Sequence, residues 1–264
     1  MKILATNDDG IHFRGLWTLV EELAPHHQIT VVAPDREQSG VGPAISLHHI
    51  LRAHPVTSPV AGVSAYAVQG TPGDCVILGL GSLAQDTELV IAGINEGANV
   101  GDDVFISGTV GAALHGYLRG LSALAISVTA LHSIHYNPAA HIAAHLVAAF
   151  ADGSLPQHAL LNVNVPDLLA HEIKGVVLAR RAHRRYDDLI QEAKDDRGKT
   201  FYWIVRQRPL GEVEDGTDIW AIRNSNVSIV SLQSDMISSE DSPQLQALRD
   251  ALWNELHHRE VSHG

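Results

Sequence analysis

The stretch KILATNDDGIHFRG, from Lys2 to Gly15, decides the fold of this chain. Its first residues read as a buried strand, which runs directly into the acidic pair Asp8-Asp9. Two adjacent carboxylates at the end of a buried strand repel each other and resist removal from water. The pair is therefore either turn chemistry, in which Gly10 supplies a positive φ, or part of a site that uses its charge.

The rest of the first 166 residues alternates between apolar runs and helical patterns. A strand at 2–6 is followed by a helical pattern at 15–27, in which Pro25 is a stop signal. Further strands are expected at 28–34, 87–95, 122–129 and 158–166, and helices at 71–83, 107–120 and 138–150. Continuous apolar strands separated by helices indicate an α/β fold, with a mostly parallel sheet covered by helices on both faces.

The pattern changes after about Pro166. Strands are expected at 175–188, 199–210 and 226–235, joined by charged loops, and a helix at 242–258. We interpret residues 1–166 as the core and residues 167–264 as a C-terminal, β-rich extension of the same domain, which serves as an arm in assembly. Strands such as the one at 199–210 expose edges that need pairing, so a homodimer or larger closed oligomer is expected.

Composition excludes several classes of protein. The 264 residues are 45% hydrophobic and 18% charged, and the formal net charge is −12. An acidic chain is a poor partner for nucleic acid, although a metal ion can still attract a small anion. Cys75 is the only cysteine, which excludes an internal disulfide and fits a reducing cytoplasm. No apolar run approaches the ~20 residues that span a bilayer, so no membrane partner is expected.

Three more loops follow expected strands and should reach the same sheet edge as Asp8-Asp9, where ligands of such sheets bind. The loop at 33–42 carries the hydroxyl of Ser39, and the loop at 92–103 carries Asn95. The segment at 106–113 opens a helix with Ser107, Gly108 and Thr109. Free backbone N–H groups at a helix N-terminus form an anion site.

Together these loops provide two carboxylates, a hydroxyl and an amide oxygen that face an anion cradle. Hard oxygen donors suit Mg²⁺ or Mn²⁺. Such an ion would offset the repulsion within Asp8-Asp9 and keep both carboxylates ionised. A metal beside a phosphate-sized anion site predicts metal-assisted hydrolysis of a phosphate ester.

Other signals are weaker. The segment GLGSLA, at 79–84, matches a dinucleotide fingerprint but lies inside a helical pattern. The basic cluster at 179–188 is either a solvated face or a flap that meets an anionic substrate. Asp218 reads as a residue at a helix N-terminus and nothing more.

Several motifs resemble, in order, those of the stationary-phase survival protein E family, the SurE-type nucleotidases. They are TNDDG, APDREQSG, TPGDCV, GINEGANVG and SGTVGAA, and LNVNVP, RGKTFYWI and GTDIWAI extend the match over roughly residues 1–235. The resemblance implies a metal-dependent phosphatase of nucleoside 5′- and 3′-monophosphates, sometimes with exopolyphosphatase activity. It also implies a Rossmann-like domain, and an oligomer, here a homodimer or homotetramer, built by exchange of C-terminal segments.

Carried over residue by residue, the resemblance implies one divalent metal ion per subunit. The residues that resemble its ligands are Asp8, Asp9, Ser39 and Asn95, with Asp8 and Asp9 also catalytic. The phosphate-binding set is Asn95, Ser107, Gly108 and Thr109. The chain departs from the family pattern at Ile106, His115 and Val230-Ser231, which bears on substrate preference and oligomer contacts.

Two rivals remain open. A receiver-like domain also binds Mg²⁺ through an acidic pair. It requires a lysine at the end of a later strand, however, and the sheet strands after Asn95 show no such lysine. A non-catalytic nucleotide-binding or assembly protein would have no need of the metal, so the Asp8-Asp9 pair argues against it. Release of phosphate from a nucleoside monophosphate with Mn²⁺, with and without chelator, separates the three.

Overall fold

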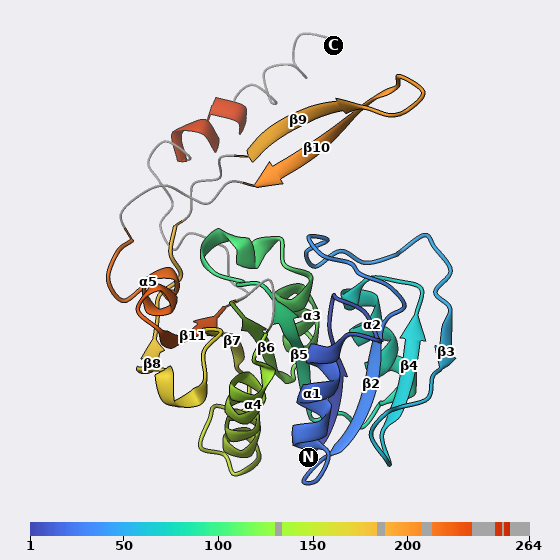
Figure 1. Ribbon diagram of the computed structural model, residues 1–264, viewed down its shortest axis with the longest axis vertical. Helices are drawn as coiled ribbons and strands as arrows, with labels where there is room; N and C mark the ends of the chain where they lie inside the picture. Colours follow the sequence, from blue (N-terminus) through green and yellow to red (C-terminus); the bar gives the residue numbers. More distant parts are fainter. Residues whose placement is uncertain (130–133, 184–187, 207–212, 234–245, 250, 254–264) are drawn as a thin grey trace. The chain divides into compact units, whose positions relative to one another are not determined.

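The structure is a computed structural model that describes residues 1–129, 134–183, 188–206, 213–233, 246–249 and 251–253 (Figure 1). The chain divides into two compact units, Met1–Leu232 and Gln233–Gly264. Residues 246–249 and 251–253 of the second unit are helical. The rest of the helix expected at 242–258 lies outside the described residues. None of the described helices is both long enough and apolar enough to cross a bilayer.

The first unit is built on a nine-stranded sheet with the order β3-β4-β2-β1-β5-β6-β7-β11-β8. The six strands from β4 to β7 are parallel, β3 and β11 are antiparallel to their inner neighbours, and β8 is parallel to β11. The strands are β1 Lys2–Thr6, β2 Gln28–Pro34, β3 Ala53–Pro55, β4 Ser64–Val68, β5 Leu89–Glu96, β6 Ser122–Val128, β7 Leu160–Val165, β8 Gly175–Leu178 and β11 Asn226–Leu232. The expected α/β fold with a mostly parallel sheet is confirmed.

Helices cover both faces of the sheet because side chains alternate along each strand. Ile3 and Ala5 of β1 pack into one apolar cluster with α1 and α4, whereas Leu4 packs into a second cluster with α2 and α3. The helices are α1 Arg14–Leu23, α2 Pro72–Leu78, α3 Gly108–Tyr117, α4 Tyr136–Ala151 and α5 Asp218–Arg223, with short turns η1 Gly79–Leu83, η2 Gly101–Phe105 and η3 Ala170–Glu172. The buried residues of β1 therefore serve two cores at once.

Some local signals had the structural effect that the sequence predicts. Thr71 caps α2, and Asp74 closes a capping box with it, so the helix begins at the Thr-Pro step. The segment from Gly79 is helical, which removes the strand–turn–helix context that a dinucleotide fingerprint needs. Strand β4, which pairs with β2, was missed by the sequence analysis.

The extension beyond residue 166 contributes to the same sheet. Strands β8 and β11 continue it past β7, and β8 ends at Leu178, well before the expected limit at residue 188. Strands β9 Asp188–Lys194 and β10 Thr200–Arg206 pair with each other in a separate antiparallel hairpin. The division at residue 166 stays an expectation, whereas the chain contacts divide the protein after Leu232.

The chain order places a topological switch point at the end of β1. From β1 the chain builds β2 and β4 on one side, and then β5, β6 and β7 on the other side. Loops that leave β1 and β5 therefore diverge, and ligands of open α/β sheets bind at such a switch point. Asp8-Asp9 follows β1, and Asn95 lies near the end of β5.

Candidate active site

The acidic pair is held in a tight turn. The Asn7 side chain bonds both backbone groups of Gly10, at 3.0 Å from Nδ2 to the carbonyl oxygen and 3.2 Å from the amide to Oδ1. Gly10 has a φ of 103°, and a Cβ there would lie 3.2 Å from the backbone of Arg36. The turn chemistry expected of this stretch is present, and it fixes the positions of the two carboxylates.

Asp8 lies against the first turn of α3. Its side chain is almost completely buried, and its Oδ1 accepts a hydrogen bond of 2.5 Å from Thr109 Oγ1. A Cβ at Gly108 would lie 2.8 Å from both Cβ and Oδ2 of Asp8. Only a glycine therefore allows the helix start to approach this carboxylate so closely.

Asp9 lies between Asp8 and the end of β5. Its carboxylate accepts a hydrogen bond from the backbone of Glu96, whose own carboxylate accepts one from the hydroxyl of Tyr136. The second oxygen of Asp9, Oδ2, is buried and has no hydrogen-bond partner within the described part of the chain. An unsatisfied buried carboxylate oxygen is costly, so this atom indicates a ligand that the protein groups do not provide.

The electrostatics of the pair indicate a cation. Burial raises the pKa of Asp8, and the hydrogen bond from Thr109 opposes that shift. Burial also raises the pKa of Asp9 to about 8, with further contributions from the charges of Asp8 and Glu96. Both shifts arise mainly because burial removes the carboxylates from water, and a divalent ion would supply the countercharge that favours their ionised forms. The donor set of this edge therefore fits a hard cation.

The other two candidate ligands lie on neighbouring segments, Asn95 in β5 and Ser39 in the loop after β2. Asn95 is buried, and its Nδ2 donates to Gly97 O at 2.9 Å, so its amide oxygen faces away from Gly97. Ser39 is exposed and donates to Glu37 Oε1 at 2.9 Å. The Ser39 loop reaches the acidic turn through a bond of 2.7 Å from Gln38 N to Asp8 O. Ser39 thus lies on a loop that contacts the acidic turn, but its hydroxyl is hydrogen-bonded to Glu37.

No cluster of three or more His, Cys, Asp or Glu residues with metal-binding geometry occurs in the part of the chain that the structure describes. The candidate metal site therefore depends on two carboxylates supplemented by neutral oxygen donors. Such a mixed oxygen set is typical of Mg²⁺ sites, which also retain water ligands.

The anion cradle is mainly a backbone feature. Ser107 is the N-cap of α3, and its hydroxyl accepts a hydrogen bond of 3.1 Å from Val110 N. The hydroxyl of Thr109 is fully buried and donates to Asp8. The backbone N–H of Thr109 also donates to the carboxylate of Asp8. The N–H of Gly108 lies in the same first helical turn, where backbone donors have no intrahelical partner, and is the group best suited to receive a phosphate oxygen.

A buried asparagine network supports the loop after Asn95, and the sequence analysis missed it. Asn164 Oδ1 accepts from Asn99 N at 2.8 Å, and Nδ2 of Asn162 and Asn164 donates to Asn99 O at 2.8 and 3.0 Å. Nδ2 of Asn99 donates to Ser127 Oγ at 2.9 Å. Two asparagines at alternate positions of the apolar strand LNVNV were the available signal, because side chains two apart share a face.

The basic cluster at 179–188 is partly used in ion pairs. Arg180 pairs with Glu214 at 2.8 Å, and Arg181 pairs with Asp102 of η2. The charges of these two arginines are therefore paired with carboxylates of the same chain. The remaining residues of the cluster that would form a flap, 184–187, lie outside the described residues.

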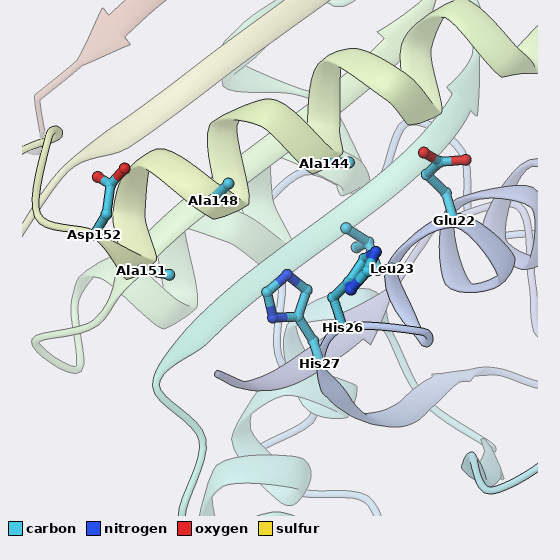
Figure 2. Close-up of a pocket in the computed structure, with 8 residues that line it drawn as sticks. All are labelled: Glu22, Leu23, His26, His27, Ala144, Ala148, Ala151 and Asp152. Atoms are coloured by element: carbon cyan, nitrogen blue, oxygen red, sulfur yellow. The ribbon is translucent and has the colours of Figure 1, made fainter.

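A separate pocket lies between the ends of α1 and α4. It has a volume of about 420 Å³ and is lined by His26 and His27 on one side and by Ala144, Ala148 and Ala151 of α4 on the other (Figure 2). The C-terminal end of α1 forms one wall, whereas the N-terminal end of α1 follows the acidic turn. This pocket is thus at the opposite edge of the sheet from Asp8-Asp9 and is no part of the candidate site.

Comparisons with known proteins identify the family to which the chain is related. Residues 3–188 match the family model described as Survival protein SurE. The chain is 43% identical to the 5′-nucleotidase SurE of Geobacter sulfurreducens over 94% of this chain and 93% of that protein. It is 45% identical to the 5′-nucleotidase SurE of a Synechococcus strain, over 93% and 96%. The crystal structure of the SurE protein from Aquifex aeolicus superposes with a TM-score of 0.80 at 33% identity, covering 94% of this chain and all of that one.

The raised pKa of Asp9 makes the metal-free protein sensitive to pH. Asp9 binds its proton more tightly in the folded chain, with a pKa of about 8, than in the unfolded chain, at about 3.9. Its contribution to stability is therefore fully present below pH ~4 and is lost as the pH rises towards 8. We expect the melting temperature measured in chelator to fall over this interval, and Asp9→Asn to flatten the fall.

The exposed Asp86 is the control, because Asp86→Asn makes the same charge change outside the site. At pH 8 in chelator, Asp9→Asn should melt higher than both the wild type and Asp86→Asn. Equal pH profiles for the wild type and Asp9→Asn would contradict the assignment of a proton to Asp9.

Proposed function

We propose that this chain, which belongs to the Survival protein SurE family, hydrolyses nucleoside 5′-monophosphates to nucleoside and phosphate with one bound Mg²⁺ or Mn²⁺ per subunit. The relatives named 5′-nucleotidase SurE support the substrate class. The observation that carries the proposal is Asp9 Oδ2, which is buried next to Asp8 and has no hydrogen-bond partner among the described residues. The proposed cation site and anion cradle would thus share one sheet edge.

The residues would divide the work as follows. Asp8, Asp9, Ser39 and Asn95 would hold the ion, which when bound polarises the phosphate and lowers the pKa of a water molecule. The Thr109 hydroxyl fixes the orientation of Asp8. The backbone N–H groups of the first turn of α3 would bind phosphate oxygens and stabilise the charge that develops on them. Ser107 contributes by capping that turn.

We extend the proposal to two further substrate classes and to the location of the protein. Nucleoside 3′-monophosphates and short polyphosphates present the same terminal phosphate to the cradle. A cytoplasmic location is supported by the single cysteine, Cys75, which is buried as a free thiol. Neither proposal alters the roles of the acidic pair.

Two other functions use the same edge differently. A receiver-like protein would accept a phosphoryl group on an aspartate, and a nucleotide-binding protein would release no phosphate. The burial of Asp8 against Thr109 argues against phosphorylation of that carboxylate, because its Oδ1 already accepts a hydrogen bond from the Thr109 hydroxyl. Release of inorganic phosphate in many turnovers distinguishes hydrolysis from both.

The acidic pair provides the decisive variants. Asp8→Asn and Asp9→Asn should each lower kcat/KM for adenosine 5′-monophosphate with Mn²⁺ by about a hundredfold or more, because losing a charged metal ligand removes several kcal/mol of transition-state stabilisation. Phosphate release is measured at saturating Mn²⁺, and excess chelator should stop it in the wild type.

Asp86→Asn serves again as the matched control and should keep wild-type turnover, since Asp86 is exposed and pairs with Lys2. Full activity of either variant of the acidic pair, or of the wild type in chelator, would refute the metal assignment.

We also propose that the chain forms a homodimer or homotetramer through its C-terminal extension. The β9–β10 hairpin carries Ile190, Tyr202, Trp203 and Ile204, each more than 60% exposed. An isolated two-stranded hairpin is at best marginally stable in water, so apolar side chains on it favour cover by another copy.

Light scattering tests this assembly. We expect the wild type to have the mass of a dimer or tetramer at micromolar concentration, and Trp203→Glu with Ile204→Glu to reduce that mass. Leu118→Glu, which changes an exposed apolar residue at the end of α3, is the control and should leave the mass of the oligomer unchanged. A wild type that is a stable, fully active monomer would disprove this mode of assembly.

A further inference from the structure

Phe105 is a half-exposed aromatic residue beside the candidate active site. It is the last residue of η2, two positions before the helix cap Ser107, and 50% of its surface is exposed. The peptide that follows it also meets the loop of Ser39, because Gly42 N donates to Ile106 O at 2.9 Å. Phe105 therefore lies between the loop that carries a candidate metal ligand and the helix start that forms the anion cradle.

The ring of Phe105 is covered on one face by a cation. The guanidinium carbon of Arg181 lies 4.8 Å from the ring centroid, and the same guanidinium pairs with Asp102. A cation at this distance over a ring is attracted to its face. Because one face is covered, the exposed part of Phe105 lies on the opposite face and the ring edge.

A buried carboxylate fixes the backbone on both sides of this contact. Asp218 is fully buried and accepts hydrogen bonds from Gly101 N at 2.7 Å, Ala182 N at 3.0 Å and Ile219 N at 2.8 Å. Gly101 precedes Asp102, and Ala182 follows Arg181. Asp218 is thus more than the helix-start residue that its sequence context indicates. It ties η2 to the segment after β8.

A single exposed apolar residue on a protein surface normally needs no explanation. Phe105 differs because a cation, an ion pair and a buried carboxylate determine where its ring lies. An aromatic face that is already immobilised loses little conformational entropy when a ligand stacks on it. Figure 1 shows η2, in green, above the ends of β5 and β6, on the same side of the sheet as the start of α3.

We propose that the open face of Phe105 is the surface on which the nucleobase of the substrate stacks. The inference rests on the proposed function and adds its base-binding site. A nucleoside monophosphate whose phosphate is bound at the start of α3 carries an aromatic base at the other end of its ribose. Stacking of a base on an aromatic side chain is tolerant of base identity, because every base has a π-face.

The test compares substrates with and without a base. For Phe105→Ala we expect KM for adenosine 5′-monophosphate to rise about tenfold, in line with the usual loss of one stacking contact, with little change in kcat. KM for ribose 5-phosphate, which has the phosphate and sugar but no base, should be unchanged. Phe105→Trp keeps an aromatic face and should retain discrimination between the two esters.

Leu118→Ala is the matched control, since Leu118 is also an exposed apolar residue but lies at the opposite end of α3. Leu118→Ala should change KM for neither ester. Thermal melts should show that all variants are folded. Equal effects of Phe105→Ala on both esters, or none on either, would overturn the proposal.

The failure of the proposed function would look different, because the wild type would release phosphate from neither ester. Calorimetric titration with the same two compounds then decides the stacking alone. Tighter binding of adenosine 5′-monophosphate than of ribose 5-phosphate, lost in Phe105→Ala, supports the role of Phe105. Equal binding of the two compounds to the wild type refutes it.

Discussion

The burial of two adjacent carboxylates, Asp8 and Asp9, is the constraint on which the rest of the candidate site depends. Each is shifted towards its protonated form by burial, and the charge of Asp8 raises the pKa of Asp9 further. The surrounding chain supplies backbone and hydroxyl donors to them, from Glu96 and Thr109. Donors of this kind orient a carboxylate but do not neutralise it. A divalent cation would do so, and the proposed phosphate ester chemistry follows from its position at this edge.

The scaffold around the pair is built to hold loops in fixed positions. The asparagine network centred on Asn99 holds the loop after β5 against β6 and β7. Asp218 holds η2 from the other side through Gly101. Hydrogen bonds among buried polar groups rigidify such loops, and the loss of one partner is costly. Asp218, in helix α5 beyond residue 166, thus helps to position a site whose proposed ligands all precede residue 110.

The sequence could predict features that are local. Strand alternation, the Thr71-Pro72 helix start and the cap at Ser107 all depend on residues close together in the chain, and the structure contains each of them. Contacts between distant segments could not be predicted in the same way. The family resemblance implies that Thr109 binds phosphate, whereas its hydroxyl donates to Asp8, 101 positions away. The hydrogen bonds from Gly101 N and Ala182 N to Asp218 join segments that only the folded protein brings together.

Whether Asp8 and Asp9 form a divalent metal site can be measured by equilibrium binding of Mn²⁺, followed by the electron paramagnetic resonance signal of the free ion. We expect one Mn²⁺ bound per wild-type chain, about a hundredfold weaker binding by Asp8→Asn, and unchanged binding by Asp86→Asn. Wild-type protein that binds no Mn²⁺, or Asp8→Asn protein that binds it as tightly as the wild type, would refute a metal site at the acidic pair.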